Sequence, residues 1–391
     1  MLNSQFGPND VTLVVSTCSR SGAVGQSYTT SNSRTISGWT DVRVSRGIER
    51  CPSDFEFSFT EPYPGVSDVI VQPGDECQVY FGADLLISGF VDRYLPSYSA
   101  RQHSIRISGR SKSQDLIDCS AHWPGGQLLN LDVLQIAKRL CGMYGIDVNL
   151  AAGTDVGDPI AQTNVIAGES TYDIVERLCR YRALLMYDQP DGSLLIASGG
   201  GQPGSGVASP IGTRTAASGF QEGVNVQTAS AMYGMDGRFS EYDVMYQGLD
   251  TCEDEGDGGN LITRVSDAAV PRFRYRVVIA ENTKGGAVVA EQRAQWELAH
   301  RYGRSFQVRL TTDSWRDSAG KLWEPNTLVA IDLPGLKMPP RTWLISEVTY
   351  KRDEGGTTAD LVIMPPEAFY QEPVILNPIS PDVSRVSNAN Q

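Results

Sequence analysis

Apolar and polar residues alternate in the N-terminal part of the chain, and this pattern predicts β-strands. The clearest case is residues 54–60, where Phe55, Phe57 and Phe59 alternate with polar residues, as in a strand with one buried and one solvated face. Further strands are expected at residues 11–16, 40–44, 76–81, 85–93 and 104–108. Short strands separated by turns predict a β-barrel or sandwich. The Ser-, Thr- and Gly-rich residues 17–38 are interpreted as a long exposed loop.

From Asn130 the apolar period becomes helical. One helical face collects the side chains of Leu131, Leu134, Ala137, Cys141 and Tyr144. Asn130 is the expected N-cap of this helix, and Gly145 is its expected end. A second helix is expected to begin at Ser170, which forms an approximate capping box with Asp173. A β-hairpin at residues 184–187 and 193–197 then completes a small α+β module.

The later part of the chain is again rich in predicted strands. Residues 199–219 are rich in Gly, Ser and Pro. Strands are expected at 241–247 and 272–280, a long helix at 287–302, and strands at 306–310, 328–333, 343–350 and 359–364. The predicted organisation is a first β-barrel domain (1–125), the α+β module (126–198), a linker (199–220), a second β-barrel domain with a helical insertion (221–368) and an extended tail (369–391).

The two β-rich regions share an internal similarity. Leu86-Ile87-Ser88 in the first region and Leu344-Ile345-Ser346 in the second both follow a turn and a strand. Both precede another strand, centred on Arg106 and on Val362. We interpret the match as two related barrels in one chain, with the alternative that any two antiparallel meanders look alike.

Composition and charge exclude several classes of protein. No apolar stretch approaches the ~18 residues that span a bilayer, so no membrane insertion is expected. The N-terminus lacks a basic region followed by an apolar run, so synthesis and assembly in a cytoplasm are expected. The chain has 33 basic and 46 acidic residues, a formal charge of −13. A protein that holds nucleic acid needs a basic surface, whereas a net acidic surface repels DNA. The charge balance therefore argues against a nucleic-acid clamp and is more consistent with a conduit through which DNA passes.

No catalytic, cofactor-binding or metal-binding residue is predicted, and no cofactor is expected. The seven cysteines form no C-x-x-C pair, which argues against a disulfide framework or a zinc site. His103, His122 and His300 accompany no G-x-S-x-G or H-E-x-x-H motif. His300, expected at the end of the long helix, is interpreted as complementing the helix dipole. The acidic residues 253–259 are interpreted as a solvated loop and the Gly-rich residues 199–206 as part of the linker.

Three further features are given structural interpretations. In residues 108–121, Gly109 is expected to turn the chain after a strand, with Asp115 and Asp118 on the polar side of a short helical turn. Arg272, Arg274 and Arg276 form a basic row, interpreted as a solvated barrel face with cross-strand ion pairs; a subunit interface or a channel lining is the alternative. Trp296 is expected to pack against a barrel.

Several stretches of the chain resemble the baseplate hub proteins of Mu-like contractile phages. They are residues 47–55, residues 73–93 and, most specifically, Ser108-Gly109-Arg110-Ser111-Lys112-Ser113-Gln114-Asp115-Leu116-Ile117-Asp118-Cys119-Ser120-Ala121. The resemblance implies a homotrimer whose paired barrels form a pseudo-sixfold ring. It also implies that the ring joins a sixfold tail tube to a threefold central spike and surrounds the path of the DNA, with no sequence-specific binding.

The leading hypothesis is therefore a non-enzymatic structural hub in the virion tail baseplate, with the central spike, the tail tube and other baseplate proteins as partners. Two alternatives stay open from the sequence. One is a cell-wall-degrading tail enzyme, since paired carboxylates can occur in any β-rich fold. The other is a glycan-binding tail module. The subunit of a related secretion or injection apparatus belongs to the same structural class as the hub.

Overall fold

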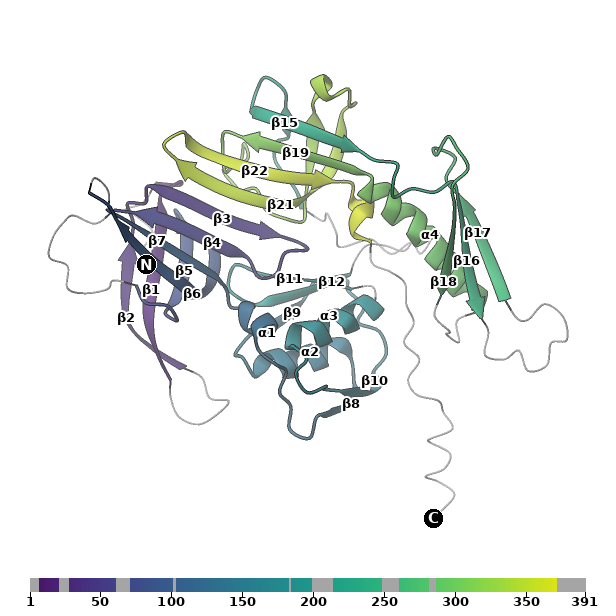
Figure 1. Ribbon diagram of the computed structural model, residues 1–391, viewed down its shortest axis with the longest axis horizontal. Coiled ribbons are helices and arrows are strands. Elements are labelled where there is room, and N and C mark those ends of the chain that lie inside the picture. The colour runs from purple at the N-terminus through teal and green to yellow at the C-terminus, as the bar shows by residue number, and fades with distance from the viewer. Residues whose placement is uncertain are drawn as a thin grey trace, which may run out of the picture.

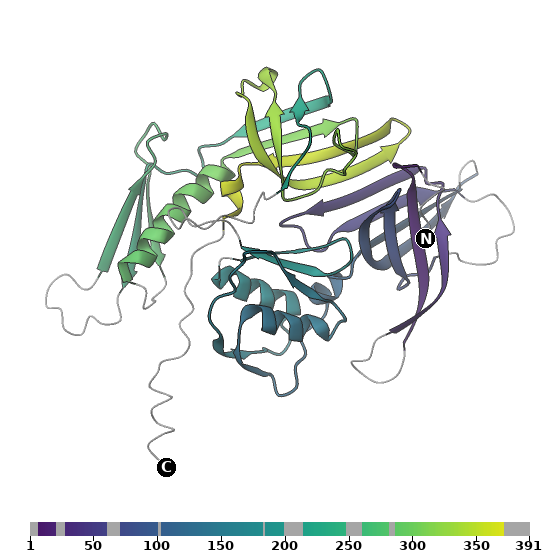
Figure 2. The ribbon, with the colours of Figure 1, turned by 180° about the vertical axis from the view of Figure 1, so that it is seen from behind.

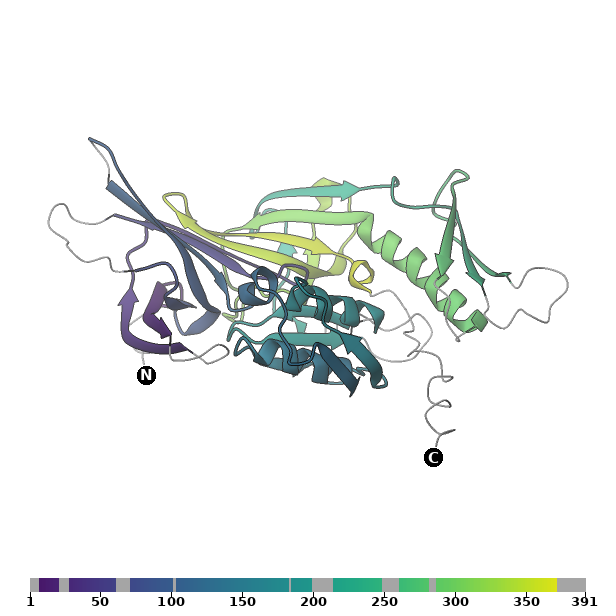
Figure 3. The ribbon, with the colours of Figure 1, turned by 60° about the horizontal axis from the view of Figure 1, so that its bottom comes forward.

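The computed structural model (Figure 1) describes residues 7–20, 28–60, 71–100, 103–182, 184–198, 214–247, 260–280 and 286–370. Strands dominate and helices are few, as the predicted β-rich α+β class requires. Most strands belong to one large curved sheet, and a compact α/β module lies against it (Figures 1 and 3). A long helix with a small separate sheet projects from one end (Figure 2).

The N-terminal part of the large sheet is called the first strand set. It consists of β1 (Val11–Arg20), β2 (Tyr28–Ile36), β3 (Asp41–Gly47), β4 (Asp54–Phe59), β5 (Glu76–Phe81), β6 (Asp84–Tyr98) and β7 (His103–Ser111). The strands are arranged in the order β3-β4-β7-β6-β5-β1-β2. The predicted alternation in β4 is confirmed, because Phe55, Phe57 and Phe59 are all buried.

The interpretation of residues 17–38 as a loop is wrong for the part that the structure describes. β1 continues to Arg20, and β2 pairs with it antiparallel, with Cys18 opposite Thr30. β2 is an end strand of the sheet and is exposed over most of its described side chains. Among the described β2 side chains Ile36 packs against the core and the others are exposed, so no apolar alternation marks this strand in the sequence. Residues 21–27 lie outside the described residues.

The C-terminal part of the large sheet is called the second strand set. It consists of β13 (Arg214–Thr215), β14 (Phe220–Gln221), β15 (Val226–Tyr233), β19 (Phe306–Thr312), β20 (Thr327–Asp332), β21 (Arg341–Asp353) and β22 (Gly356–Met364). Short 3-10 helices, η2 (Pro334–Leu336) and η3 (Pro366–Phe369), follow β20 and β22. The linker expected at 199–220 ends earlier, because β13 and β14 already pair with β20. Residues 199–213 lie outside the described residues.

The two strand sets share their topology. The order β5-β6-β7-β4-β3 of the first set recurs as β20-β21-β22-β19-β15 in the second. A β-bulge interrupts β6–β7 between Val91 and Arg93, and the same bulge interrupts β21–β22 between Ile345 and Glu347. Ile345 therefore corresponds to Val91 rather than to Ile87, so the tripeptides that suggested the repeat are not equivalent positions. The repeat itself is confirmed at the level of strand order.

β3 and β21 join the two strand sets into one sheet. Their antiparallel ladder runs from Glu347 opposite Gly47 to Arg352 opposite Val42. Within it, the Ser45 Oγ lies 3.1 Å from the Thr349 Oγ1. In the residues that the structure describes, no ladder closes either set into a barrel, and the two predicted barrels are instead halves of a 14-stranded sheet.

One hydrophobic core contains side chains of both strand sets. Trp315, which follows β19, is fully buried and stacks on Phe81 of β5 with 4.1 Å between the ring centroids. Tyr350 of β21 meets Phe81 edge to face. Next to Trp315, the Arg316 guanidinium forms an ion pair with Asp84 at 2.6 Å. These contacts fasten the second strand set to the first independently of the β3–β21 ladder.

The α/β module has its own core. Its elements are α1 (Gln114–Asp118), β8 (Gln127–Leu131), α2 (Val133–Gly142), β9 (Val148–Leu150), β10 (Ile160–Asn164), α3 (Thr171–Tyr181), β11 (Leu184–Asp188) and β12 (Leu194–Ser198). The hairpin of β11 and β12 is confirmed. So is the N-cap of α3, where the Ser170 hydroxyl accepts a hydrogen bond from the Asp173 backbone N–H at 3.0 Å.

The expected start of α2 is wrong. Asn130 and Leu131 belong to β8, and Asp132 is the N-cap, in a reciprocal capping box with Gln135. Either Asn or Asp can supply the side-chain oxygen that an N-cap needs. Leu131 is buried as part of β8 and not as part of the helix. Because it is apolar and lies just before α2, it made the helical pattern in the sequence look longer than the helix is.

A separate small sheet projects from the second strand set. It consists of β16 (Glu241–Gln247), β17 (Asn260–Ser266) and β18 (Tyr275–Ala280) in the order β17-β16-β18, and α4 (Gly286–Arg304) covers one face (Figures 1 and 2). Val244, Val278 and Ala294 form the small core between helix and sheet. No helix in the described part of the chain has the length and apolar character needed to cross a membrane.

Candidate functional site

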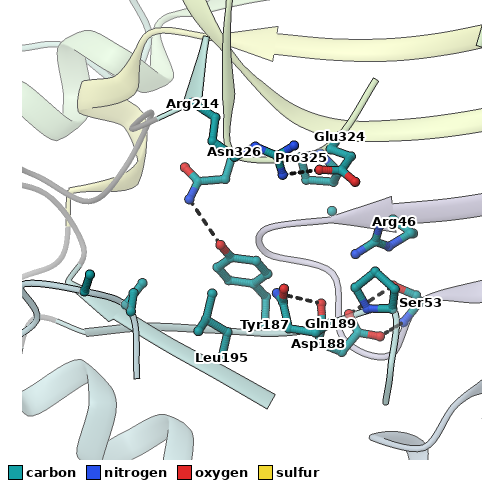
Figure 4. A pocket seen from close by; sticks show the side chains of 15 residues that line it. Arg46, Ser53, Tyr187, Asp188, Gln189, Leu195, Arg214, Glu324, Pro325 and Asn326 are labelled. Carbon is teal, nitrogen blue, oxygen red and sulfur yellow. Dashed lines mark hydrogen bonds and ion pairs between the residues drawn. The ribbon is translucent and has the colours of Figure 1, made fainter. Parts of the chain in front are cut away.

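A cavity of about 370 Å³ lies where the two strand sets meet the α/β module. Figure 4 shows side chains from β3, from the β11–β12 hairpin and from the residues before β20 around it. The lining includes Arg46, Ser53, Tyr187, Asp188, Gln189, Leu195, Arg214, Glu324, Pro325 and Asn326. Because three parts of the chain meet here, this cavity is the best candidate for a site that fixes their arrangement.

Asp188 ties the module to the first strand set. Its carboxylate accepts hydrogen bonds from the Ser53 backbone N–H at 3.0 Å and from the Ser53 hydroxyl at 2.9 Å. Asp188 is 3% exposed and Ser53 is 1% exposed. Buried charge-assisted hydrogen bonds of this kind are strong, and losing one partner leaves the other without compensation. No sequence pattern indicates this pair, because the two residues are 135 positions apart.

Replacing Asp188 by Ala is expected to lower the free energy of unfolding by about 2–3 kcal/mol, since it leaves two buried Ser53 donors without an acceptor. Chemical denaturation measures the loss. Ser53→Ala removes only the hydroxyl donor and should cost less than Asp188→Ala. The double variant should cost less than the sum of the two single losses, because the residues share one interaction; additive losses would contradict the assignment.

The other contacts around the cavity are also structural. The Asn326 side-chain amide donates to the Tyr187 hydroxyl at 3.1 Å (Figure 4), which links the residues before β20 to β11. Burial raises the pKa of Tyr187, so its phenol stays protonated at neutral pH. Arg214 forms an ion pair with Glu324. The polar groups of the cavity thus bind one another across the junction.

The three histidines lie in different parts of the fold, and the interpretation of His300 needs correction. His103 opens β7, and His122 is exposed in a loop. α4 continues past His300 to Arg304. The His300 ring stacks on Trp296 with 4.8 Å between the centroids, and burial together with Arg304 lowers its pKa to about 4. His300 is therefore neutral at pH 7 and supplies no charge to the helix dipole.

This lowered pKa makes stability depend on pH. In the unfolded chain His300 regains its ordinary pKa of 6.5, above the folded value of about 4. The unfolded chain therefore binds the proton first as pH falls, and the free energy of unfolding should decrease between pH 6.5 and 4, by about 2–3 kcal/mol from this group. Denaturation of the wild type and of His300→Gln across this range measures the effect. Equal pH slopes in the two proteins would contradict it.

Trp296 is held at the C-terminal end of the second strand set. Its indole N–H donates to the Tyr370 carbonyl at 2.7 Å, and the Arg293 guanidinium lies over the ring. The expectation that Trp296 is packed rather than exposed is confirmed. Its partner is the segment after η3 and not the face of a barrel.

The Arg110 side chain connects strand β6 and helix α1 through two ion pairs. It lies in residues 108–121, the segment with the most specific resemblance to baseplate hub proteins. It forms ion pairs with Asp92 of β6 and with Asp118 of α1, both at 2.7 Å. The helical turn expected near Leu116 is confirmed as α1. Gly109 does not turn the chain, because β7 continues to Ser111. A Cβ there would lie 2.3 Å from the Phe90 carbonyl oxygen, so Gly109 allows β6 and β7 to approach.

The basic row and the apolar row on β18 are placed differently from the expectation. Arg274 and Arg276 lie over the ring of Phe239, at 5.1 and 5.3 Å from its centroid, instead of forming an ion-paired barrel face. The exposed face carries Phe273, Tyr275, Val277 and Ile279, which are 40–80% exposed. The strand itself begins at Tyr275, three residues later than predicted.

The remaining candidate groups are the cysteines and clusters of metal-ligating side chains. Cys18, Cys51, Cys77, Cys119, Cys141 and Cys179 are free, and burial raises the pKa of the Cys51 and Cys141 thiols to about 12. Among the described residues, no group of three His, Cys, Asp or Glu could hold a metal ion. Cys252, the acidic residues 253–259 and the Gly-rich residues 199–206 lie outside the described residues.

Comparison with solved structures identifies the class of protein as a phage tail protein. The fold matches the 43 kDa tail protein of prophage MuSo2 from Shewanella oneidensis with a TM-score of 0.74 and 25% identity, covering 93% of this chain and 99% of that one. It also matches the tail protein from Neisseria meningitidis MC58 with a TM-score of 0.66 and 19% identity, covering 92% and 99% of the two chains.

Sequence comparison narrows this class to one family. Family models match at residues 30–111 (Mu phage baseplate assembly protein GpP-like, N-terminal), 113–198 (baseplate hub protein gp44-like, second domain) and 286–372 (Mu phage baseplate assembly protein GpP, fourth domain). Baseplate hub protein gp44 of Escherichia phage Mu is 30% identical over 343 residues, 86% of each chain. The chain belongs to this family of phage baseplate hub proteins.

Proposed function

We propose that the chain is a structural, non-enzymatic hub that works as a homotrimer in the baseplate of a contractile tail. In this role it adapts the sixfold tail tube to the threefold central spike and surrounds the passage of the DNA. The observation that carries the proposal is the repeated strand order in a member of the baseplate hub family. Three chains with two similar strand sets each offer six similar positions, so one ring can meet both symmetries.

The charge of the chain supports a conduit for DNA. A formal charge of −13 disfavours retention of a polyanion, because DNA-binding surfaces need a basic footprint. DNA is accordingly a passing contact and no sequence-specific ligand. The partners are the spike, the tube and other baseplate proteins, and assembly takes place in the host cytoplasm before the hub becomes part of the virion tail.

The segments of the chain divide this work. Residues 1–125 and 221–368 provide the two ring positions, and the module at 126–198 braces them through the Asp188–Ser53 and Tyr187–Asn326 contacts. The linker of this division ends before β13, and its C-terminal tail begins after Tyr370. This division into domains is part of the proposal.

Light scattering after size exclusion, over a dilution series, tests the homotrimer. A persistent species of three times 42.5 kDa, seen as a threefold ring by electron microscopy, is expected. A chain that remains monomeric at every concentration would overturn a preformed hub. The structural role is tested separately: purified protein at high concentration should release no soluble fragments from cell walls, and turnover would favour the enzymatic alternative.

A further inference from the structure

Besides the edge of β2 at one end, the described part of the large sheet includes two open strand edges. One is β15, at the end of the sheet, whose ladder partner is β19 (Figure 1). The other is the second half of β6: its ladder with β5 ends at Phe90, and beyond that point its ladder partner is β7. The backbone of a strand edge is a template for another strand.

The internal repeat relates these edges to a junction that the chain already makes. The shared bulge sets Val91 equivalent to Ile345 and Arg93 equivalent to Glu347. Counting on along the strands makes Leu95 of β6 equivalent to Thr349 of β21. The first set therefore presents, on β6, the same edge that the second set presents on β21 and uses to pair with β3.

The same reasoning relates β15 to β3. Val44 pairs with Phe55, which pairs with Gly109. In the second set, Ala231 pairs with Val308, which pairs with Ile363. The bulge sets Gly109 equivalent to Ile363, so Val44 is equivalent to Ala231 and the next residue, Ser45, to Met232.

Within the chain, Ser45 pairs with Thr349, and their hydroxyl oxygens are 3.1 Å apart. We propose that a second copy of the chain repeats this junction, with β15 of one protomer pairing antiparallel with residues 93–98 of β6 of the next, and Met232 directly opposite Leu95. The proposal rests on the homotrimer proposed above and assigns its interface to these two strands.

The side chains on the two edges support this pairing independently of the repeat. Leu95 is 47% exposed and Met232 is 51% exposed, and Tyr98 and Tyr233 are exposed close by. The sequence of β15, Val-Gln-Thr-Ala-Ser-Ala-Met-Tyr, contains no charged residue, and the facing segment 93–98 contains one, Arg93 at its start. Edge strands that avoid pairing usually carry charges. Pro96 removes one N–H donor from β6, which costs the ladder at most one hydrogen bond.

The second copy is the occupant that fits, because the two edges are different and complementary. Pairing β15 with β6 is a head-to-tail contact, which generates a closed ring if the rotation between units closes. Inside one chain the β21–β3 junction already sets that rotation between units. Repeating it at every chain boundary gives a ring in which all unit-to-unit junctions are alike, as a pseudo-sixfold trimer requires.

Disulfide trapping tests the pairing in the full-length chain. Residues directly opposite in an antiparallel ladder have Cα atoms about 4.5–5.5 Å apart, within the range of a disulfide. Leu95→Cys with Met232→Cys, oxidised in the purified trimer, is expected to give covalent dimers and trimers and nothing larger. The matched control is Leu95→Cys with Ala231→Cys, in which the second thiol points to the opposite face. That variant, each single variant and the parent with its native cysteines should form none.

The outcomes separate this interface from the homotrimer itself. A trimer by light scattering without specific cross-linking would overturn the strand pairing and leave the homotrimer standing. A monomer at every concentration would overturn both. Covalent species larger than three chains would show an open filament and overturn the closed ring.

A second variant tests the interface without new cysteines. Met232→Lys places a charge at the proposed contact and should raise the protein concentration at which the trimer dissociates about tenfold or more. Leu129→Lys, on β8 of the module, changes a residue that is 59% exposed and should leave the concentration unchanged. Equal dissociation of the two variants would overturn the proposal.

Discussion

Replacing Trp315 by Ala is expected to lower the free energy of unfolding by about 3–5 kcal/mol, the range for removing a fully buried large aromatic side chain. Trp315 is 0% exposed and stacks on Phe81 of the first strand set. Its indole N–H donates to the Thr358 carbonyl at 2.8 Å, which would lose this donor. The substitution therefore removes a contact between the strand sets as well as volume. Chemical denaturation followed by intrinsic fluorescence measures the loss.

Two controls separate the packing of Trp315 from the general cost of removing a tryptophan. Trp315→Phe keeps the stacking on Phe81 and should cost clearly less than Trp315→Ala. Trp296→Ala removes a tryptophan that is only half-buried and belongs to α4, and it should also cost less. If Trp315→Ala matches Trp296→Ala, the contact between the strand sets does not depend on this side chain.

Replacing Gly89 by Ala is expected to cost about 3 kcal/mol or more, at the upper end of the cost of overpacking. A Cβ at this position would lie 1.8 Å from the Arg110 carbonyl oxygen and 2.7 Å from the Ser111 Cα, both backbone atoms. The clash cannot be relieved by moving a side chain, so β6 and β7 must separate. The expected results are a lower thermal midpoint and faster amide exchange in these two strands.

Gly142→Ala is the matched control, because Gly142 ends α2 and a Cβ there would meet nothing within 4 Å. Alanine is a better helix former than glycine, so this change should leave stability unchanged or raise it by up to about 1 kcal/mol. A loss of stability in Gly142→Ala similar to that in Gly89→Ala would show that the close approach of β6 and β7 is not the cause.

Local pattern predicted the elements that bury one regular face. The Phe alternation of β4 and the boundaries of β5 and β16 follow from period-two patterns, and the N-cap of α3 follows from Ser170. The hairpin of β1 and β2 escaped prediction because an exposed edge strand needs no apolar face. The alternation in β18 predicted a strand correctly, yet the pattern does not say which face α4 covers. The larger apolar residues of β18, Tyr275 and Ile279, are exposed.

The candidate site escaped prediction for a different reason. The sequence shows that Asp188 ends an apolar strand. The role of its carboxylate, however, depends on the hydrogen bonds from Ser53, and no local pattern links two residues that are 135 positions apart. The same holds for the junction between β3 and β21. The repeat was visible in the sequence as two similar regions. Their joining into one sheet depends on the pairing of two edge strands, β3 and β21, which no local sequence pattern predicts.

The β3–β21 junction also has a consequence for synthesis of the chain. Ser45 meets Thr349, which is 304 positions later. At about 5–20 residues per second, the ribosome needs roughly 15–60 s to make the intervening chain. Throughout that interval the nascent first strand set displays the uncovered backbone of β3, next to other nascent copies on the same message. During this time β3 can pair with a strand of another nascent chain, because β21 of its own chain has not yet been made. The time needed for translation therefore affects whether β3 pairs within its own chain.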